Sequence, residues 1–461
     1  MKKNIFILLV SFLSLTPALT SAHAFGQQYI LPLPVWLYTF GGGAAIIVSF
    51  LLIGYFATQP NPKSLQACIE LSRWKFFSFF AKPVSLAIFK LIGLVLFIIT
   101  LTSGIWGSQL PSWNFATNFF WIIFLLGGTY LTALVGDIWE VVNPWKTIAL
   151  GLGHSKVFQY PSRLGYLPAL AFYFFLIWLE LLSGGTGAAP QNLSMYLLWY
   201  TAITIGGSSL FGIKDWFYFG DVFSVFFRLI SKLSPIAYAE GKIKLRWPLV
   251  GLLEGTAEHF SLLLFIILML SSTAYDGFKE TFRAYEFISA LSFIHSYQNK
   301  QLILFFDIFL LFLFIYLIAI WLMKQIVKSD ISIKDIALIF AFSLIPIALA
   351  YNLAHYFTLF LVQGQQIIPA ISDPFNLGWN LFGTSQYAMN VGIMGAKAIW
   401  QMQLVFILVG HISAVYIAHI LALRTFGARK DAVLSQLPML AVMVCYTMIG
   451  LWILAQPLIL P

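Results

Sequence analysis

The sequence predicts an all-α membrane protein: a helical bundle of about ten transmembrane helices that follows a cleaved N-terminal signal peptide. Of its 461 residues, 60% are hydrophobic and only 9% are charged, and the mean hydropathy is +0.88. Soluble globular chains are about a quarter charged. The apolar residues gather in runs of roughly twenty, the length that crosses a bilayer as a helix. Lys and Arg fall between these runs, mostly in alternate connections, as expected of a multi-pass protein.

The first residues have the pattern of a secretory signal. Lys2 and Lys3 precede a short apolar run, and Ala22-His23-Ala24 has the small-x-small form of a cleavage site. We therefore expect a signal peptide over 1–24 and one integral membrane domain over 25–461. Cleavage after Ala22 is the alternative to cleavage after Ala24, and it would make His23 the new N-terminus.

Ten apolar runs in the mature chain are long enough to span a membrane. No linker rich in Pro, Gly or Ser divides them into separate domains. Their expected limits are 35–57, 84–106, 117–141, 165–183, 193–212, 254–275, 301–323, 335–362, 398–423 and 435–456.

The distribution of positive charge predicts the orientation of these spans. With the mature N-terminus outside, 19 Lys and Arg lie in inner connections, and four lie in outer ones: Lys279, Arg283, Lys300 and Lys397. Positively charged connections stay on the cytoplasmic side. The sequence thus predicts a bacterial inner-membrane protein with both mature ends on the periplasmic side.

The net charge of +9 does not indicate a nucleic-acid partner, because the basic residues are scattered among connections beside apolar spans. The expected partner is the lipid bilayer, together with other membrane subunits or a second copy of the chain. The inner segment 214–235 mixes aromatic and charged residues and predicts an amphipathic helix lying along the membrane surface. The two cysteines, Cys68 and Cys445, form no disulfide or metal motif.

Acidic residues flank two spans on the inner side. Asp137 and Glu140 share a helix face near the end of the third span, where a Lys or Arg of an inner connection is their expected partner. Glu254 and Glu258 are expected at the start of the sixth span, where the helix dipole favours negative charge.

Toward the outer side, polar groups gather around spans seven to nine. Asp307 lies near the outer end of the seventh span, and Asn352 and His355 share a face of the eighth, after a kink expected at Pro346. Ionisable groups inside spans are costly and suggest function. We expect an outward-facing polar cavity here, and an interhelical hydrogen-bond cluster that fixes packing is the alternative. The residues expected to line it are Asp307, Asn352, His355, Asp373 and His411, with Gln363, Gln366 and Trp379 as substrate contacts.

Three chemistries fit such a cavity. A membrane hydrolase would use a divalent metal to activate water, with Asp307, His355 and Asp373 as catalytic residues. The expected metal ligands are Asp307, His355 and His295, or copper bound by a freed His23. A transporter or proton-coupled permease would use acids and histidines at two depths as a relay, and a non-catalytic subunit of a membrane complex is a further alternative.

Haem is the third chemistry and the least favoured. The candidate axial ligands are His259, His411 and His419. His411 and His419 are eight residues apart on one predicted helix, or about 12 Å along its axis. This spacing is cramped for two stacked macrocycles, and the chain has no c-type attachment motif.

Several stretches resemble a family of bacterial multi-pass membrane proteins labelled fenitrothion hydrolase-like. They are "HAFGQQYILPLPVWLY" (23–38), "NPWKT" (143–147), "AHYFTLFLVQGQQIIPAISDPFNLGWNLFG" (354–383) and "GHISAVYIAHILALRTFG" (410–427). The resemblance extends over most of the chain. It implies hydrolysis of an organophosphorus triester, as one subunit of a membrane-bound hetero-oligomer, and it assigns no catalytic residue.

Overall fold

The structure is a computed structural model, and it describes residues 21–22, 29–30, 33–59, 67–153, 156–239 and 241–456. The expected signal peptide over 1–24 lies almost wholly outside these residues, as does His23. Two short strands, β1 (Ser21–Ala22) and β2 (Tyr29–Ile30), pair antiparallel before the first long helix.

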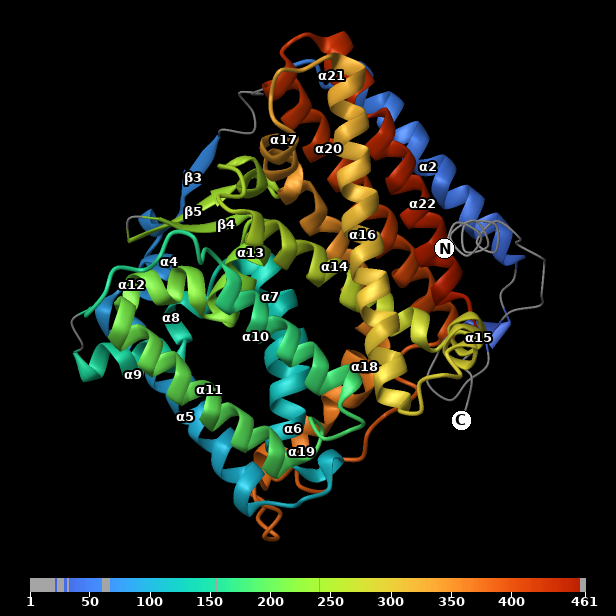
Figure 1. Ribbon diagram of the computed structural model, residues 1–461. Coiled ribbons are helices and arrows are strands. Elements are labelled where there is room, and N and C mark those ends of the chain that lie inside the picture. Colours follow the sequence, from blue (N-terminus) through green and yellow to red (C-terminus); the bar gives the residue numbers. More distant parts are fainter. Residues whose placement is uncertain are drawn as a thin grey trace.

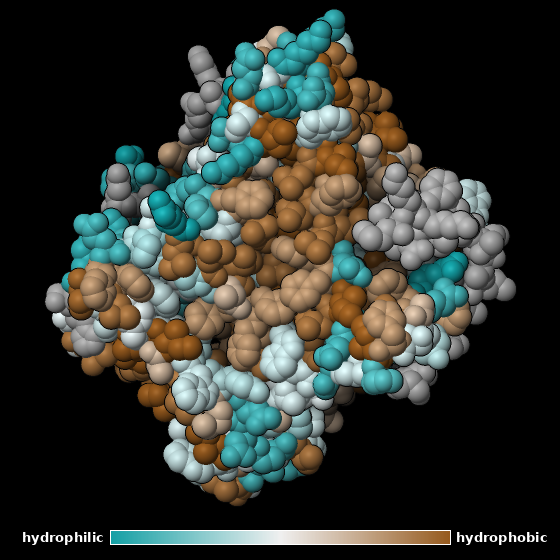
Figure 2. Space-filling view, in the orientation of Figure 1, coloured by the Kyte–Doolittle hydropathy of each residue, from teal (hydrophilic) through white to brown (hydrophobic). Residues whose placement is uncertain are grey.

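Within the described residues, eight helical stretches are long and apolar enough to cross a membrane. They form one helical bundle (Figure 1), and Figure 2 shows that hydrophobic residues cover the middle of the visible face, with hydrophilic residues gathered toward its ends. The chain is therefore a multi-pass helical membrane protein. The eight stretches are α2 (Val35–Phe56), α5 (Pro83–Trp106), α6 to α7 (Phe115–Val135), α14 (Phe260–Lys279), α16 (Tyr297–Val327), α17 to α19 (Ile333–Ser372), α20 (Ala396–Phe426) and α21 to α22 (Arg429–Leu454).

The other two expected spans are also helical. One is α10 (Leu167–Ile177), which continues as the π-helical η4 (Trp178–Leu182), and the other is α11 (Pro190–Phe211). The first is shorter than the eight, and the second carries more polar residues, including Gln191, Asn192 and Ser194. Ten spans thus remain a prediction, whereas the helical, multi-pass architecture is confirmed.

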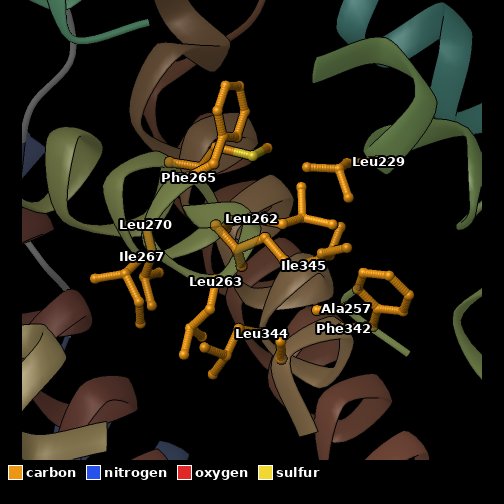
Figure 3. Packing of buried hydrophobic residues seen from close by; sticks show 14 of the residues in the cluster. Leu229, Ala257, Leu262, Leu263, Phe265, Ile267, Leu270, Phe342, Leu344 and Ile345 are labelled. Carbon is orange, nitrogen blue, oxygen red and sulfur yellow. The ribbon is translucent and has the colours of Figure 1, made fainter. Parts of the chain in front are cut away.

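Helix α14 is the centre of the bundle. In its most apolar stretch 89% of the residues are buried, against 17% for the peripheral α5. Its side chains pack against α10, α16 and α18, and Figure 3 shows Leu262, Leu263 and Phe265 of α14 among the buried residues of the core. Lipid is as apolar as these side chains, so close van der Waals packing rather than escape from water holds such a helix in place.

Helices α18 (Ile345–Val362) and α20 cross closely in the interior. A side chain at Gly410 would overlap Ala350 and would lie 2.8 Å from the carbonyl oxygen of Pro346. The expected kink is present: a 3-10 turn, η7 (Ala341–Leu344), separates α17 (Ile333–Phe340) from α18, and Pro346 lies in the first turn of α18. There its missing N–H costs no helical hydrogen bond.

The expected limits of two spans were wrong. In both cases the correct limits change which charged residues lie on the helix. The third span ends at Val135 because Gly136 adopts φ +89°, so Asp137 and Glu140 follow the helix instead of lying inside it. The sixth span, α14, begins at Phe260 rather than 254 and continues to Lys279. Glu254 and Glu258 are therefore in the preceding connection, and Asp276 and Lys279 are on the helix.

A three-stranded antiparallel sheet lies at one end of the bundle and was not expected from the sequence. Its order is β3 (Cys68–Glu70), β5 (Lys242–Arg246) and β4 (Ile236–Ala239). Cys68 pairs with Arg246, and Glu70 pairs with Lys244. We call this end of the molecule the sheet side, and the opposite end, with α15 (Phe282–Ala290) and α19 (Ile367–Ser372), the loop side (Figure 1).

The prediction of an amphipathic surface helix over 214–235 was wrong. The segment folds as α12 (Ile213–Asp215), π-helical η5 (Trp216–Gly220) and α13 (Val222–Ser231), and α13 is buried on most of its surface, including Phe223, Val225 and Phe227. Asp221 caps α13 and is fully buried, where it accepts hydrogen bonds from Tyr200 and Ser224. The aromatic residues thus face protein instead of membrane.

The remaining elements either form parts of the third, sixth and last of the eight stretches or connect the helices. They are η1 (Leu71–Arg73), α4 (Lys75–Phe80), η2 (Pro111–Trp113), α6 (Phe115–Thr117), η3 (Asn118–Gly127), α7 (Gly128–Val135), α8 (Trp139–Val142), α9 (Pro144–Leu152), η6 (Val250–Leu253), η8 (Gln363–Gln366), α21 (Arg429–Ser435) and α22 (Leu437–Leu454).

Candidate functional site

A cavity of about 900 Å³ lies on the sheet side, at the N-terminal end of α14. It is enclosed by the sheet, by α13, by η6 and by the ends of α10, α14 and α20. Its volume is that of pockets that hold small organic ligands. The charged and aromatic residues that line it are Asp137, Glu140, Tyr166, Tyr218, Arg228, Lys232, Tyr238, Lys244, Arg246, Glu254, Glu258, Phe342 and Arg424.

Five cations line this cavity, and most of them are held in place by neighbours. The Arg228 guanidinium donates to the carbonyl oxygen of Tyr218 at 2.6 Å and lies 4.1 Å from the centre of the Tyr218 ring. Arg246 forms an ion pair with Glu254 at 2.9 Å. Arg424 donates to the carbonyl oxygen of Leu253 at 2.6 Å. These contacts fix the positions of the guanidinium groups, which is how a binding site is preorganised.

The two lysines of the cavity are held less firmly. Lys232 donates to the carbonyl oxygens of Gly251 and Glu254 at 3.4 and 3.3 Å, and burial lowers its pKa. Lys244 is half-buried on β5 and makes no side-chain hydrogen bond or ion pair with any residue that the structure describes. Its ammonium group is therefore available to a ligand. Lys242, on the same strand, is exposed, does not line the cavity and pairs with Glu70 at 3.3 Å.

The acids of the cavity differ in their partners. Glu140 pairs with Lys146, as expected for the acids that follow the third span. The Glu258 carboxylate accepts hydrogen bonds from Tyr218 at 2.7 Å and Tyr166 at 3.3 Å. Neither Glu254 nor Glu258 lies at the start of α14, so the dipole explanation for them was wrong.

Asp137, like Glu258, forms no ion pair with a cation among the described residues. It accepts a hydrogen bond from the backbone N–H of Glu140 at 3.2 Å. Burial and then the nearby Glu140 charge raise its pKa to about 6. A carboxyl group that titrates near neutral pH beside a cavity is a candidate proton acceptor.

The polar residues expected at the outer side do not form one cavity. Instead, His355 belongs to a compact ion cluster on the loop side. Its Nε2 lies 2.8 Å from the Asp276 carboxylate, which also accepts a hydrogen bond from Tyr356 at 2.7 Å and pairs with Lys279 at 2.8 Å. We call Asp276, Lys279, His355 and Tyr356 the outer ion cluster.

Asp307 does not join His355, and the expected pairing of the two was wrong. Its side chain is exposed on the face of α16 that points away from the bundle, and no hydrogen bond or ion pair joins it to the described residues. His295 is also exposed, in the connection before α16. The expected metal ligands Asp307, His355 and His295 are therefore not brought together. Nowhere in the described part of the chain do three His, Cys, Asp or Glu side chains lie close enough to hold a metal ion.

Asp373 organises its own loop rather than facing His355. One carboxylate oxygen accepts from the backbone N–H of Leu377 at 2.9 Å, and the other accepts from Gly378 and Trp379 at 2.7 and 3.0 Å. These bonds hold the chain in a turn in which Gly378 adopts φ +84°. Trp379 is 43% exposed and contacts the ring of Phe375. The catalytic assignment of Asp373 therefore has no geometric support.

The glutamine that fixes the loop side is Gln365, and not the two glutamines expected as substrate contacts. Gln365 is buried, donates to the carbonyl oxygens of Leu361 and Asn390, and accepts from Tyr387 and the N–H of Asn390. Gln363 and Gln366 are half-buried and make no side-chain hydrogen bond within the described residues. Asn352 is half-buried, and its side-chain oxygen is enclosed with no partner in the part of the chain that the structure describes.

The three histidines considered for haem each have a structural role. His259 caps α14 and accepts from the N–H of Ser261 at 3.2 Å. His419 contacts the carbonyl oxygen of Ala57 at 2.9 Å and the side chain of Gln436 at 2.9 Å, so both ring nitrogens are engaged. His411 donates to the carbonyl oxygen of Ile407 at 2.8 Å, and its Nε2 has no partner among the described residues. Of the three, His419 alone has both ring nitrogens engaged by the described residues.

The residues of the cavity come from segments far apart in the sequence, which is why sequence reasoning did not group them. Comparison with known proteins adds no name to the site, because no family model, curated protein or solved structure matches this chain.

Proposed function

We propose that this protein is a membrane transporter that binds a small organic anion in the sheet-side cavity. The observation that carries the proposal is the cavity itself: about 900 Å³, at one end of the buried central helix, with five cations on its walls. Pockets that combine apolar walls with a few convergent polar groups are the usual sites of small-molecule binding.

The chemistry of the walls favours an anion with an aromatic or aliphatic part. Arg228, Arg246 and Arg424 are held by carbonyl or carboxylate groups, and Lys244 has its ammonium group available. Charge-assisted hydrogen bonds to phosphate or carboxylate are roughly twice as strong as neutral ones. Tyr238 and Phe342 provide ring surface for the apolar part.

Transport rather than a purely structural role is supported by the ionic groups at both ends of α14. The cavity lies at its N-terminal end, and the outer ion cluster lies at its C-terminal end, about 30 Å away for a helix of this length. Charged groups at two depths along a central helix are typical of transporters. We propose ten spans, with α10 and α11 among them, the sheet side cytoplasmic and both mature ends periplasmic, because the positive charge of the connections favours that orientation.

The proposal is tested by uptake of 4-nitrophenyl phosphate, an aromatic phosphate, into inside-out vesicles that contain the protein. We expect uptake above that of empty vesicles, inhibited by aromatic carboxylates and sulfonates. Lys244→Gln removes a charge-assisted contact, so we expect uptake about tenfold weaker at low substrate concentration. Lys242→Gln, on the same strand but outside the cavity, should leave uptake unchanged. Absence of 4-nitrophenyl phosphate uptake above that of empty vesicles, or equal effects of the two substitutions, contradicts the proposal.

A second candidate function uses the same cavity. The resemblance to fenitrothion hydrolase-like membrane proteins suggests hydrolysis of an organophosphorus triester, and Asp137 favours it because its carboxyl group titrates near pH 6. Water would attack phosphorus, a nitrophenolate would leave, and the Asp137 carboxylate would take the proton. Release of nitrophenolate from fenitrothion by the purified protein, lost in Asp137→Asn, would favour this function. Such an activity could also require a further membrane subunit or a second copy of the chain.

A further inference from the structure

The outer ion cluster is built like a site that exchanges a proton. Asp276 is 8% exposed, and its two carboxylate oxygens are shared among His355, Tyr356 and Lys279. The side chains of His355 and Lys279 keep 17% and 19% of their surface exposed. The carboxylate is therefore held inside the protein, while the imidazole can exchange protons with the loop side.

A second observation points to a small ligand beside the cluster. Tyr351 is buried, with only 5% of its surface exposed, and its hydroxyl has no partner among the described residues. The absence of a side chain at Gly277 brings this hydroxyl and the His355 ring to the same place: a Cβ there would lie 3.4 Å from Tyr351 Oη and 3.5 Å from His355 Cε1. The side-chain oxygen of Asn352, the residue after Tyr351, also has no partner in the described part of the chain. Buried polar atoms of this kind are normally satisfied, by water where the protein provides no partner.

The other charged groups around the cluster fit a proton better than a metal cation. Glu180, in η4, interacts electrostatically with Asp276 and Lys279, and Glu280 lies 3.9 Å from Lys279. From α16, Gln301 accepts a hydrogen bond from the neighbouring Tyr275 and donates one to Tyr297, and neither α16 side chain bonds to Asp276. Lys279 already occupies one oxygen of Asp276, and an ammonium in that position repels a metal ion.

We propose that His355 and Asp276 form a proton-binding site, open to the loop side, that controls access to the sheet-side cavity through α14. A proton on His355 places a second positive charge beside Lys279 and changes how the two cations share the Asp276 carboxylate. Asp276 and Lys279 are on α14, and the same continuous helix presents Leu262 to the cavity at its other end. A change in the contact between α14 and α18 on the loop side is thus carried to the cavity wall. The purpose of this site, control of access to a transport cavity, rests on the proposed function. Its test does not, because the test measures labelling of a cysteine and not uptake of an anion.

Cys68 provides the test, because it is exposed and lines the cavity. In full-length protein carrying Cys445→Ala, Cys68 is the only cysteine. Inside-out vesicles are prepared with a lumen at about pH 7.5 or about pH 5.5, and the bath stays at about pH 7.5. The rate of labelling of Cys68 by a membrane-impermeant maleimide is then measured without any anion present. We expect the rate to differ by about threefold or more between the two lumen conditions.

Substitutions identify the groups responsible. His355→Gln should abolish the response of the Cys68 labelling rate to lumen pH. Asp276→Asn should also abolish this response, and it provides the test if His355→Gln fails to fold. His295→Gln, which removes an exposed histidine outside the cluster, should respond as the parent does. A parent protein with equal rates at both lumen pH values, or a His355→Gln variant that still responds, overturns the proposal. Replacing sodium by choline should change nothing, and a response that depends on sodium would also overturn it. Failure of anion uptake, in contrast, leaves these rates unaffected.

Discussion

At the scale of single residues, carboxylates with similar sequence contexts have different environments in this protein. Asp276 and Asp307 both lie toward the loop-side ends of apolar helices. Asp276 is buried with three partners, whereas Asp307 is exposed with none among the described residues. A hydropathy pattern locates a carboxylate along a helix, but it does not say which face of the helix meets protein. The sequence therefore identified His355 correctly as a residue with a polar partner and assigned that partner wrongly.

Asp137 gives a prediction for the dependence of stability on pH. Its pKa in the folded protein is about 6, above the usual value of 3.8, so the folded state keeps a proton that the unfolded state has released. Stability therefore falls as pH rises from about 4 to about 6, and the loss persists at higher pH. We expect Asp137→Asn to be more stable than the parent at neutral pH by about 1–2 kcal/mol, a range reduced for screening by solvent. The stabilities of Asp137→Asn and the parent should converge near pH 4.

This prediction is measured by thermal unfolding of the purified protein in detergent across the pH range. Asp330→Asn is the control, because Asp330 is exposed on the sheet side without a side-chain partner in the described chain. Parallel pH profiles for Asp137→Asn and the parent would show that the carboxyl group is not perturbed.

At the scale of elements, the sequence located the helices well and their ends less well. Apolar runs of about twenty residues determine where a helix crosses, and all ten expected segments are helical. The ends depend on single residues such as Gly136, whose positive φ stops the third span. The sixth span was expected to end at 275, whereas α14 continues to Lys279, and this error of four residues concealed the outer ion cluster by placing Asp276 and Lys279 in a connection. An Asp and a Lys three residues apart after an apolar run was the signal available.

The sheet was missed although its hairpin has a readable pattern. "KIKLR" (242–246) alternates polar and apolar residues directly after a glycine, as expected of a strand that follows a turn. In a chain dominated by long apolar runs, this short segment was read only as an inner connection. Its Lys244 and Arg246 line the cavity, so the omission also hid the candidate site.

The crossing of α18 and α20 predicts a large effect of a small substitution. A methyl group at Gly410 would overlap Ala350 and crowd the carbonyl of Pro346, so the helices must separate. We expect Gly410→Ala to lower the free energy of unfolding by about 1–3 kcal/mol. Gly206 on α11 is the matched control, since nothing lies within 4 Å of its added Cβ. Gly206→Ala should be neutral or stabilising by up to about 1 kcal/mol. Equal thermal stability of the two variants would contradict the close crossing.

The loop between α19 and α20 predicts an effect on local order. Gln365 holds Tyr387 and Asn390 against the end of α18 through its side-chain amide. We expect Gln365→Ala to raise the rate of chymotrypsin cleavage within 373–395 by about tenfold, because local opening becomes easier. Gln363→Ala, which removes no side-chain hydrogen bond among the described residues, should cleave as the parent does. Similar rates for both variants would show that Gln365 does not order the loop.

At the scale of the whole molecule, composition predicted the class of protein and charge asymmetry predicted its orientation. Neither predicts a cavity, because a cavity depends on side chains that converge from distant segments. The walls of this one come from the connection after α7, from α13, from β5 and from the end of α20, which are separated by up to nearly three hundred residues. The expected outer cavity followed from polar residues close together in sequence. That reasoning found real hydrogen-bond clusters, but the large cavity lies on the opposite side.

The central claim is that an organic anion binds in the sheet-side cavity, and Cys68 reports on it directly. In the Cys445→Ala background, we expect 4-nitrophenyl phosphate to slow maleimide labelling of Cys68 in a saturable manner. Lys244→Gln should require about tenfold more of the anion for the same protection. Lys242→Gln should behave as the parent. Labelling that no concentration of the anion slows, or protection that Lys244→Gln and Lys242→Gln weaken equally, would contradict the claim that this cavity is the binding site.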